Sequence, residues 1–187
     1  MKHRQLIDFL EVIGKLKTYT RHVWDSNRRQ ESVADHCWRL SVMALLVAEK
    51  FPHLDFNKII RMCLIHDFGE ALTGDIPSFY KTESDKKKED LAVDDLLKLL
   101  PEGLAAEFSE LFVEMEELKT EEAKLFKALD RLEAIASHNE SPLDTWLELE
   151  YTENLVYGNE NVGFSEYLTK LRDILREDSI RKIESGE

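Results

Sequence analysis

The sequence predicts an all-α protein, a bundle of seven to eight helices around a buried site. Three observations support this fold class. Apolar side chains recur at helical spacing along nearly all of the 187 residues, and no segment shows a convincing strand alternation. Only seven glycines and four prolines interrupt the chain. Hydrophobic residues make up 43% of the sequence, which is enough for the core of one domain.

Capping and breaking residues divide the N-terminal part. A first helix is expected at about 3–16, and a loop follows it. Ser32 and Asp35 have the spacing of a capping box, which predicts the start of a second helix. An apolar stripe at 40–47 gives this helix a buried face, and Pro52 ends it.

The elements after Pro52 follow the same logic. Asp55 is placed to cap a third helix that extends to about His66. The segment from Glu70 to Lys81 contains a Thr-Gly pair and a proline, which predict a turn and loop. The remaining helices are expected at about 84–100, 102–118, 121–138, 142–157 and 164–184, with a Gly-Asn-Glu-Asn break before the last. Thr120 is placed to cap the helix at 121–138.

Charge and cysteine content narrow the classes of function. The formal net charge of −13 repels phosphate backbones, so a nucleic-acid polymer is not an expected partner. Cys37 and Cys63 fit a reducing compartment as small buried side chains. The longest uncharged run, 40–48, is far shorter than the ~20 residues that span a bilayer. We therefore expect a cytoplasmic protein with no membrane partner.

The stretch LIHDFGEALTGDIP, residues 64–77, places charged side chains at the end of an apolar helix. His66 and Asp67 lie there, and His36 and Asp130 fall on inward faces of two other helices. An unpaired buried carboxylate costs several kcal/mol, so a shared divalent metal is the favoured explanation. Two nitrogen and two oxygen ligands leave coordination positions open and suit Mn, Fe, Co or Zn.

The order His, His-Asp, Asp resembles the signature of the HD-domain metal-dependent phosphohydrolases. The segments ESVADH, HDFGEALTGDIP and KALDRLE together resemble the 5′-deoxynucleotidase branch of that family, over roughly 16–139. The resemblance implies one HD domain over 1–187, with a core at about 16–139 and C-terminal helices at 140–187. It also implies hydrolysis of deoxyribonucleoside 5′-monophosphates to deoxynucleoside and phosphate by a homodimer with one divalent metal ion per site.

The resemblance assigns roles to individual residues. The implied metal ligands are His36, His66, Asp67 and Asp130. Glu70 and Asp75 match the acidic pair that holds or activates the attacking water. Arg21 and Trp24 match residues that line the nucleotide site, with the wider spacing of eukaryotic relatives. Lys81, in SFYK where many relatives read TPxxK, corresponds to a phosphate contact.

Ordinary structural roles stay open for several of these residues. Glu70 lies one turn beyond His66 if the helix continues, and the alternative is that it only helps to end that helix. Asp75 could form an Asx turn before Ile-Pro. Arg21 could be a surface arginine, and Trp24 could pack in the core.

Two other functions also stay open. One is an HD phosphohydrolase that acts on a dNTP or on a cyclic or signalling nucleotide. The other is a non-catalytic HD module that binds a nucleotide or a partner protein. Apolar side chains on the helices at 84–118 could face a second subunit or complete the core of the chain: Leu96, Leu97, Leu111 and Phe112.

Overall fold

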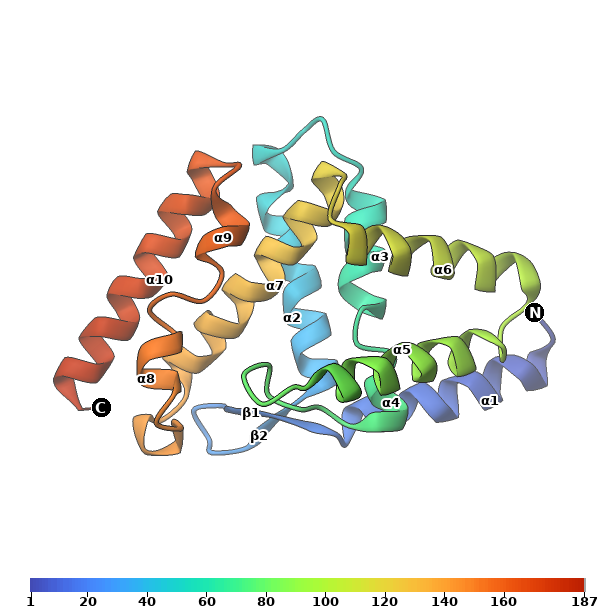
Figure 1. The fold of residues 1–187 in the computed structure, drawn as a ribbon, viewed down its shortest axis with the longest axis horizontal. Coiled ribbons are helices and arrows are strands. Elements are labelled where there is room, and N and C mark those ends of the chain that lie inside the picture. The colour runs from blue at the N-terminus through green and yellow to red at the C-terminus, as the bar shows by residue number, and fades with distance from the viewer. Residues whose placement is uncertain (187) are drawn as a thin grey trace.

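The computed structural model describes residues 1–186, and its mainly helical content confirms the predicted all-α class (Figure 1). The longer helices are α1 His3–Ile13, α2 Val33–Val47, α3 Phe56–Ile65, α5 Glu83–Leu97, α6 Glu102–Glu117, α7 Glu121–Glu140 and α10 Glu166–Ser185. Shorter helices lie between them, namely α4 Glu70–Thr73, α8 Glu150–Glu153 and α9 Asn159–Val162. Within the described residues, no helix combines the length and apolarity needed to cross a membrane.

The predicted caps are present. The Ser32 side chain accepts from the N–H of Asp35, and the Asp35 side chain accepts from the N–H of Ser32. Asp55 caps α3, and Thr120 caps α7 by accepting from the N–H of Ala123. These bonds satisfy N–H groups that the first helical turn leaves free, so the starts of these helices depend on local sequence.

Helices α2, α3 and α7 pack together at the centre of the molecule (Figure 1). Their buried faces meet through fully enclosed side chains that include Leu40, Ile59, Met62, Leu125 and Leu129. Helix α10 packs along α7, while α1, α5 and α6 extend to the other side. The inward faces predicted for His36 and Asp130 belong to the two longest central helices, so this packing positions the site.

The apolar residues of α5 and α6 complete the core of this chain. Leu96, Leu97 and Leu111 are buried, and the partly buried Phe112 packs against the clusters that contain Leu97 and Leu111. For Leu96, Leu97 and Leu111, burial within the single chain therefore favours the core alternative over a contact with a second subunit.

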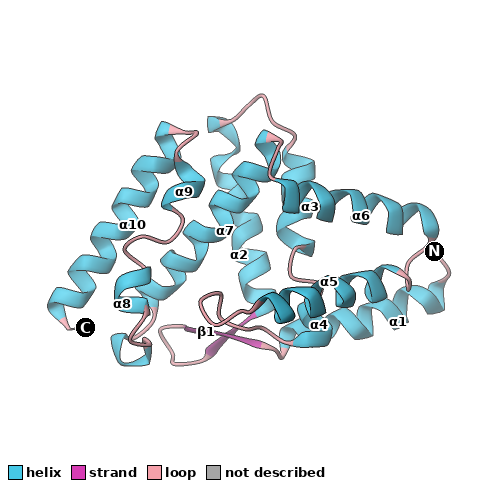
Figure 2. Cartoon of the chain, in the orientation of Figure 1, coloured by secondary structure: helices cyan, strands magenta, loops and turns pink. Residues whose placement is uncertain are grey.

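The loop expected after the first helix contains a small hairpin, shown in magenta in Figure 2. Strand β1 Thr20–Trp24 pairs antiparallel with β2 Gln30–Ser32. The TRHVW segment is rich in β-branched and aromatic residues, which favour a strand. The Asp25 carboxylate accepts from the N–H groups of Asn27 and Arg29 and closes the turn. The hairpin packs against α7.

The segment 142–157 is not the single helix that helical spacing predicts. It contains a 3₁₀ turn at Leu143–Thr145, then extended backbone at Trp146, then α8. The Trp146 indole donates to the carbonyl oxygen of His138, and the Glu150 carboxylate accepts from the N–H of Leu147. The Trp146 bond holds the segment against α7, and the Glu150 bond fixes the chain at the start of α8 in place of a longer helix.

The expected break at Gly-Asn-Glu-Asn contains the short helix α9. Gly158 has φ +78°, and the helix begins directly after it. The chain therefore changes direction at this glycine before α9 packs against α7 and α10.

Candidate metal centre

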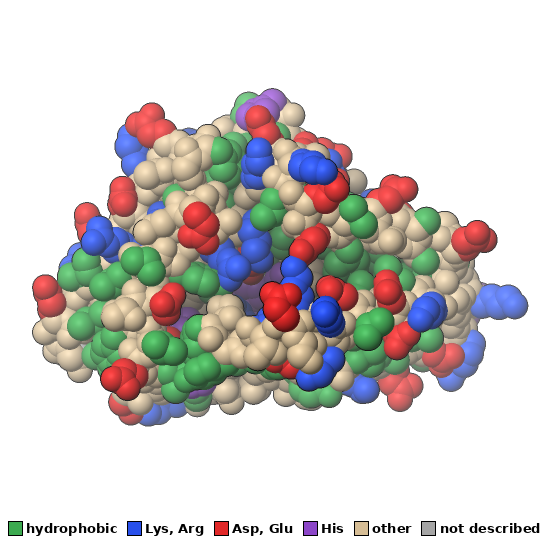
Figure 3. Space-filling model, viewed as in Figure 1, with side chains coloured by type: hydrophobic (Ala, Val, Ile, Leu, Met, Phe, Trp, Pro, Cys, Tyr) green, Lys and Arg blue, Asp and Glu red, His purple; other side chains and the backbone are tan. Residues whose placement is uncertain are grey.

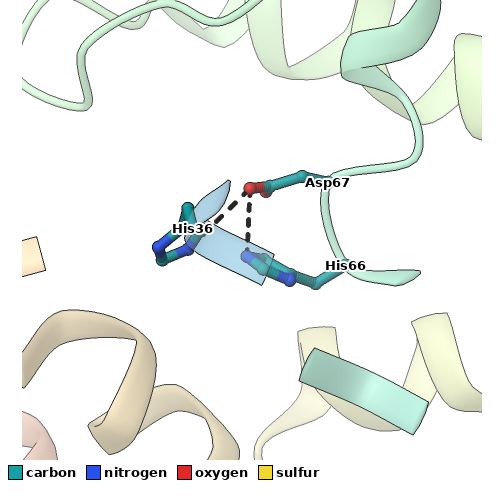
Figure 4. Close-up of side chains that lie close together, drawn as sticks. All are labelled: His36, His66 and Asp67. Carbon is teal, nitrogen blue, oxygen red and sulfur yellow. Dashed lines mark ion pairs between the residues drawn. The ribbon is translucent and has the colours of Figure 1, made fainter. Parts of the chain in front are cut away.

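Four predicted side chains converge between the central helices. His36 lies on α2, His66 and Asp67 directly follow α3, and Asp130 lies on α7. The Nε2 atom of His36 is 3.3 Å from Oδ1 of Asp130 and 4.0 Å from Oδ2 of Asp67. The Nε2 atom of His66 is 3.1 Å from Oδ2 of Asp67 and 3.7 Å from Oδ1 of Asp130. Figure 4 shows the Asp67 carboxylate directed at both rings.

Each imidazole is held through its other nitrogen. His66 Nδ1 donates to the carbonyl oxygen of Cys63 at 3.0 Å, and His36 Nδ1 donates to Oε2 of Glu133 at 2.5 Å. Both Nε2 atoms therefore face the two aspartates. Among residues 1–186, the buried Nε2 of His66 has no hydrogen-bond partner, although Oδ2 of Asp67 is close. A buried nitrogen with an unused lone pair is what a metal ligand provides.

The donor set and its spacing fit a transition-metal ion. Bonds of about 2.0–2.2 Å to such an ion place neighbouring donor atoms about 3 Å apart. The measured nitrogen–oxygen separations run from 3.1 to 4.0 Å. Two imidazoles and two carboxylates suit Mn, Fe, Co or Zn, and they do not close the coordination sphere.

The chain reaches Glu70 through tight turns and not through a continued α3. Helix α3 ends at Ile65, and the N–H of Glu70 donates to the carbonyl oxygen of Asp67 at 3.0 Å. Glu70 then opens the short helix α4 inside the segment expected to be a loop. Gly74 ends α4 with φ +75°, a conformation that costs glycine little, and Asp75 follows it at the cavity wall.

Burial and neighbouring charges raise the pKa values of some acidic groups and lower those of others. Burial, together with the charges of Asp67 and Asp75, raises the pKa of Glu70 to about 10. Burial also raises the pKa of Asp75, against the opposing effect of Arg21. The pKa of Asp67 lies below its ordinary value despite burial, because His66 stabilises the carboxylate. Carboxylates crowded in this way would be stabilised by a divalent cation.

The pKa values of the other two ligand candidates reflect their hydrogen bonds and ion pairs. The pKa of Asp130 lies well below its ordinary value despite burial, because Lys127 and His36 stabilise its charged form. Burial and the charge of Arg21 lower the pKa of His36, but hydrogen bonds to Asp130 and Glu133 outweigh them and raise it to about 9.

A cavity of about 660 Å³ opens onto these residues, and an adjoining groove of about 500 Å³ shares Glu70 and Lys81 with it. In Figure 3 this face is hollowed near its centre, with histidine at the floor and basic side chains around it. Most of these cations have acidic partners, with Lys81 at 2.7 Å from Glu89 and Arg21 at 2.8 Å from Glu31. The cavity lining thus combines cations with carboxylates in an acidic protein.

Of the three residues predicted to contact substrate, two line the cavity and one does not. Arg21 and Lys81 line the cavity together with Glu70 and Asp75. Trp24 is not among the cavity-lining residues, and its ring packs edge-on against His22 at 4.6 Å between centroids. His22, to which the sequence analysis assigned no role, also lines the cavity.

Glu133 is a site residue that the sequence analysis missed. Its side chain is 1% exposed, and Oε1 accepts from the Ser137 hydroxyl at 2.7 Å while Oε2 faces His36. Burial alone would raise the pKa of Glu133, but His36 and Arg21 lower it to about 2. The buried side chain therefore stays charged. The sequence contained a signal, because Glu133 follows Asp130 by three residues and so lies near the same helical face.

Comparisons with known proteins find an HD domain and similar phosphohydrolases. The HD domain model matches residues 13–172. The 5′-deoxynucleotidase HDDC2 of Bos taurus is 37% identical over 73% of this chain and 68% of the relative, and the Homo sapiens protein is 36% identical over the same shares. The crystal structure of a predicted metal-dependent phosphohydrolase from Magnetospirillum magnetotacticum superposes with a TM-score of 0.80, at 29% identity, covering 96% of this chain and 93% of that one.

A further solved structure shares the fold at lower sequence identity. The HD phosphohydrolase DatZ of cyanophage S-2L, bound to dA and one catalytic Zn²⁺ ion, superposes with a TM-score of 0.59 at 18% identity, covering 94% of this chain and 96% of that one.

Proposed function

This chain belongs to the HD domain family, and we propose that it is a metal-dependent 5′-deoxynucleotidase that converts deoxyribonucleoside 5′-monophosphates to deoxynucleosides and phosphate. The observation that carries the proposal is the convergence of two imidazoles and two carboxylates, one of whose buried nitrogens has no hydrogen-bond partner among residues 1–186. The relatives named 5′-deoxynucleotidase, which align over more than two thirds of both chains, support the choice of substrate.

In this proposal His36, His66, Asp67 and Asp130 hold one divalent ion. The ion would polarise the phosphoryl oxygens, lower the pKa of a water molecule and favour the ionised form of Glu70. Its identity is proposed to be Mn, Co, Fe or Zn, from the donor types alone.

Glu70 and Asp75 handle the water and its proton. The buried Oε2 of Glu70 has no partner within the described chain, so it is free to accept a proton from the attacking water. Asp75 lies on the same cavity wall and would orient that water. The water oxygen bonds to phosphorus, the bond from phosphorus to the 5′-oxygen breaks, and a proton ends on that 5′-oxygen.

The cavity-lining cations would offset the charge of the phosphate. Arg21 and Lys81 line the cavity, and Lys127 lies 2.9 Å from Oδ2 of Asp130. Because these cations already have acidic partners, they favour a monophosphate over a more highly charged triphosphate. The alternative substrates, dNTPs and cyclic or signalling nucleotides, belong in the same assay.

The test is phosphate release from dAMP, dGMP, dCMP, dTMP and dUMP with Mn or Co added. Turnover of these compounds, above that of dNTPs and cyclic nucleotides, is expected. His36→Ala and Asp130→Ala should lose bound metal, while His53→Ala should not, because His53 is exposed and pairs with Glu121. Metal-loaded protein that hydrolyses none of the five would refute the proposed activity.

The assembly and the compartment are further parts of the proposal. Leu91 on α5 and Val113 on α6 are more than half exposed in the single chain, and they are candidates for a homodimer contact. Light scattering on the purified protein tests this. The cytoplasmic location inferred from the sequence is consistent with Cys37 and Cys63, which are buried and free.

A further inference from the structure

A second group of polar side chains lines the same cavity but takes no part in the proposed chemistry. It consists of His22 on β1, His138 on α7, and Glu150 and Asn154 from the C-terminal part. Glu150 is 2% exposed and Asn154 is 5% exposed, which is unusual for such polar residues. No motif of the sequence pointed to these C-terminal residues.

Glu150 orients the His22 ring. Its Oε2 accepts from the N–H of Leu147 at 2.7 Å, and its Oε1 lies 3.1 Å from Nδ1 of His22. A carboxylate can only accept, so the His22 proton sits on Nδ1. The Nε2 atom of His22 is then a hydrogen-bond acceptor.

His138 has the opposite arrangement. The side-chain nitrogen of Asn154 lies 3.3 Å from Nδ1 of His138. An amide nitrogen can only donate, so Nδ1 accepts and the ring proton sits on Nε2. Burial and the charge of Arg21 lower the pKa of His138 to about 3, which keeps the ring neutral. The Nε2 atom of His138 is then a donor.

Within residues 1–186, the hydrogen bonds of His22 and His138 use only their Nδ1 atoms. The two Nε2 atoms have no hydrogen-bond partner there, and they are not among the fully buried atoms. Both rings line the cavity. The cavity wall therefore presents one acceptor, Nε2 of His22, and one donor, Nε2 of His138. Glu150 and Asn154 fix the two ring tautomers through the Nδ1 atoms.

Helix α7 gives the distance between this pair and the metal ligands. Asp130, Ala134 and His138 are spaced by four residues and all line the cavity, so they share one face of α7. Eight residues at about 1.5 Å each place His138 about 12 Å along the helix from Asp130. This matches an extended mononucleotide, with phosphate at the metal end and base at the other. The small Ala134 side chain between them leaves room for the sugar.

We propose that His22 and His138 bind the base of the nucleotide, with Glu150 and Asn154 as positioning residues. The inference rests on the proposed nucleotidase activity and adds the residues that recognise the nucleoside. The Watson–Crick edge of each DNA base has an N–H donor beside an oxygen or nitrogen acceptor. One acceptor and one donor on the cavity wall can therefore hydrogen-bond to any of these bases, so they distinguish a nucleotide from a sugar phosphate without selecting one base.

The experiment compares each deoxyribonucleoside 5′-monophosphate with 2-deoxyribose 5-phosphate, which lacks the base. The readout is the ratio of their kcat/KM values in wild type, His138→Phe and His22→Phe. Each variant should lower this ratio about 10-fold, mainly through KM for the nucleotide, because one hydrogen bond to the base is lost. His138→Gln keeps a donor near the position of Nε2 and should recover part of the ratio.

His53→Phe is the matched control, because it changes an exposed histidine outside the cavity and should leave both substrates unaffected. Thermal melting of each variant reports folding. A purely structural role would lower both kcat/KM values in parallel, and an unchanged ratio in both folded variants overturns the inference. If the wild type hydrolyses 2-deoxyribose 5-phosphate as well as the nucleotides, base recognition fails while the phosphatase activity stands. If it hydrolyses no nucleotide, the proposed function fails and the inference with it.

Discussion

Replacing Glu133 with glutamine tests whether His36 needs a charged partner in order to hold metal. Oε2 of Glu133 lies 2.5 Å from Nδ1 of His36, and the side chain is 1% exposed. Glutamine keeps the size of the side chain and can still accept a hydrogen bond from Nδ1. The substitution therefore removes the charge while it preserves the shape and the tautomer of His36.

The expected loss follows from that contact. Removing a partner behind a metal-binding histidine typically costs 10- to 100-fold in affinity, and each factor of ten corresponds to about 1.4 kcal/mol. Because glutamine retains the hydrogen bond and loses only its charge, we expect the lower end of the range. The Kd for Mn should rise about 10-fold, or about 1.4 kcal/mol.

Calorimetric titration of metal-free protein with Mn measures this Kd. Glu140→Gln is the control, since Glu140 is on the same helix but is 61% exposed and pairs with Arg39 at 2.6 Å. The control should bind as the wild type does, because exposed ion pairs contribute little. A folded Glu133→Gln protein whose Kd stays within a factor of two of wild type would refute the role of Glu133.

Three further predictions concern turnover, pH and the backbone. Glu70→Gln should keep metal by elemental analysis yet lose at least about 100-fold in kcat, and near-normal turnover would exclude Glu70 as the base. Because the pKa of His138 falls to about 3 on folding, the unfolded chain binds more protons below pH ~6.5, so folding stability falls as pH falls. Urea unfolding at pH 7 and 5 should show wild type losing about 2 kcal/mol more than His138→Gln, whereas equal losses contradict this prediction. Gly158→Ala should destabilise the chain by about 1–2 kcal/mol in the same assay, because φ is +78° and the added Cβ would lie 2.9 Å from Cβ of Arg131. A variant as stable as wild type would show that this turn adapts.

Local sequence predicted the helices whose ends carry their own signals. Ser32, Asp55 and Thr120 each cap the helix that they were expected to cap. It failed where long-range contacts replace local bonds. The segment expected to be a loop after the first helix forms a hairpin that packs on α7. Trp146 bonds to the carbonyl oxygen of His138, so 142–157 does not form the single helix that helical spacing favours.

The sequence by itself determined the all-α class and the inward faces that bear His36, His66, Asp67 and Asp130, because helical period and capping act within a few residues. Only the tertiary structure decided what surrounds those side chains. It placed Glu133 behind His36, moved Trp24 off the cavity wall and brought Glu150 to His22 across 128 residues of chain. Such partners come into contact only when whole helices and strands pack together. The local spacing of apolar residues does not predict which side chains will then be neighbours.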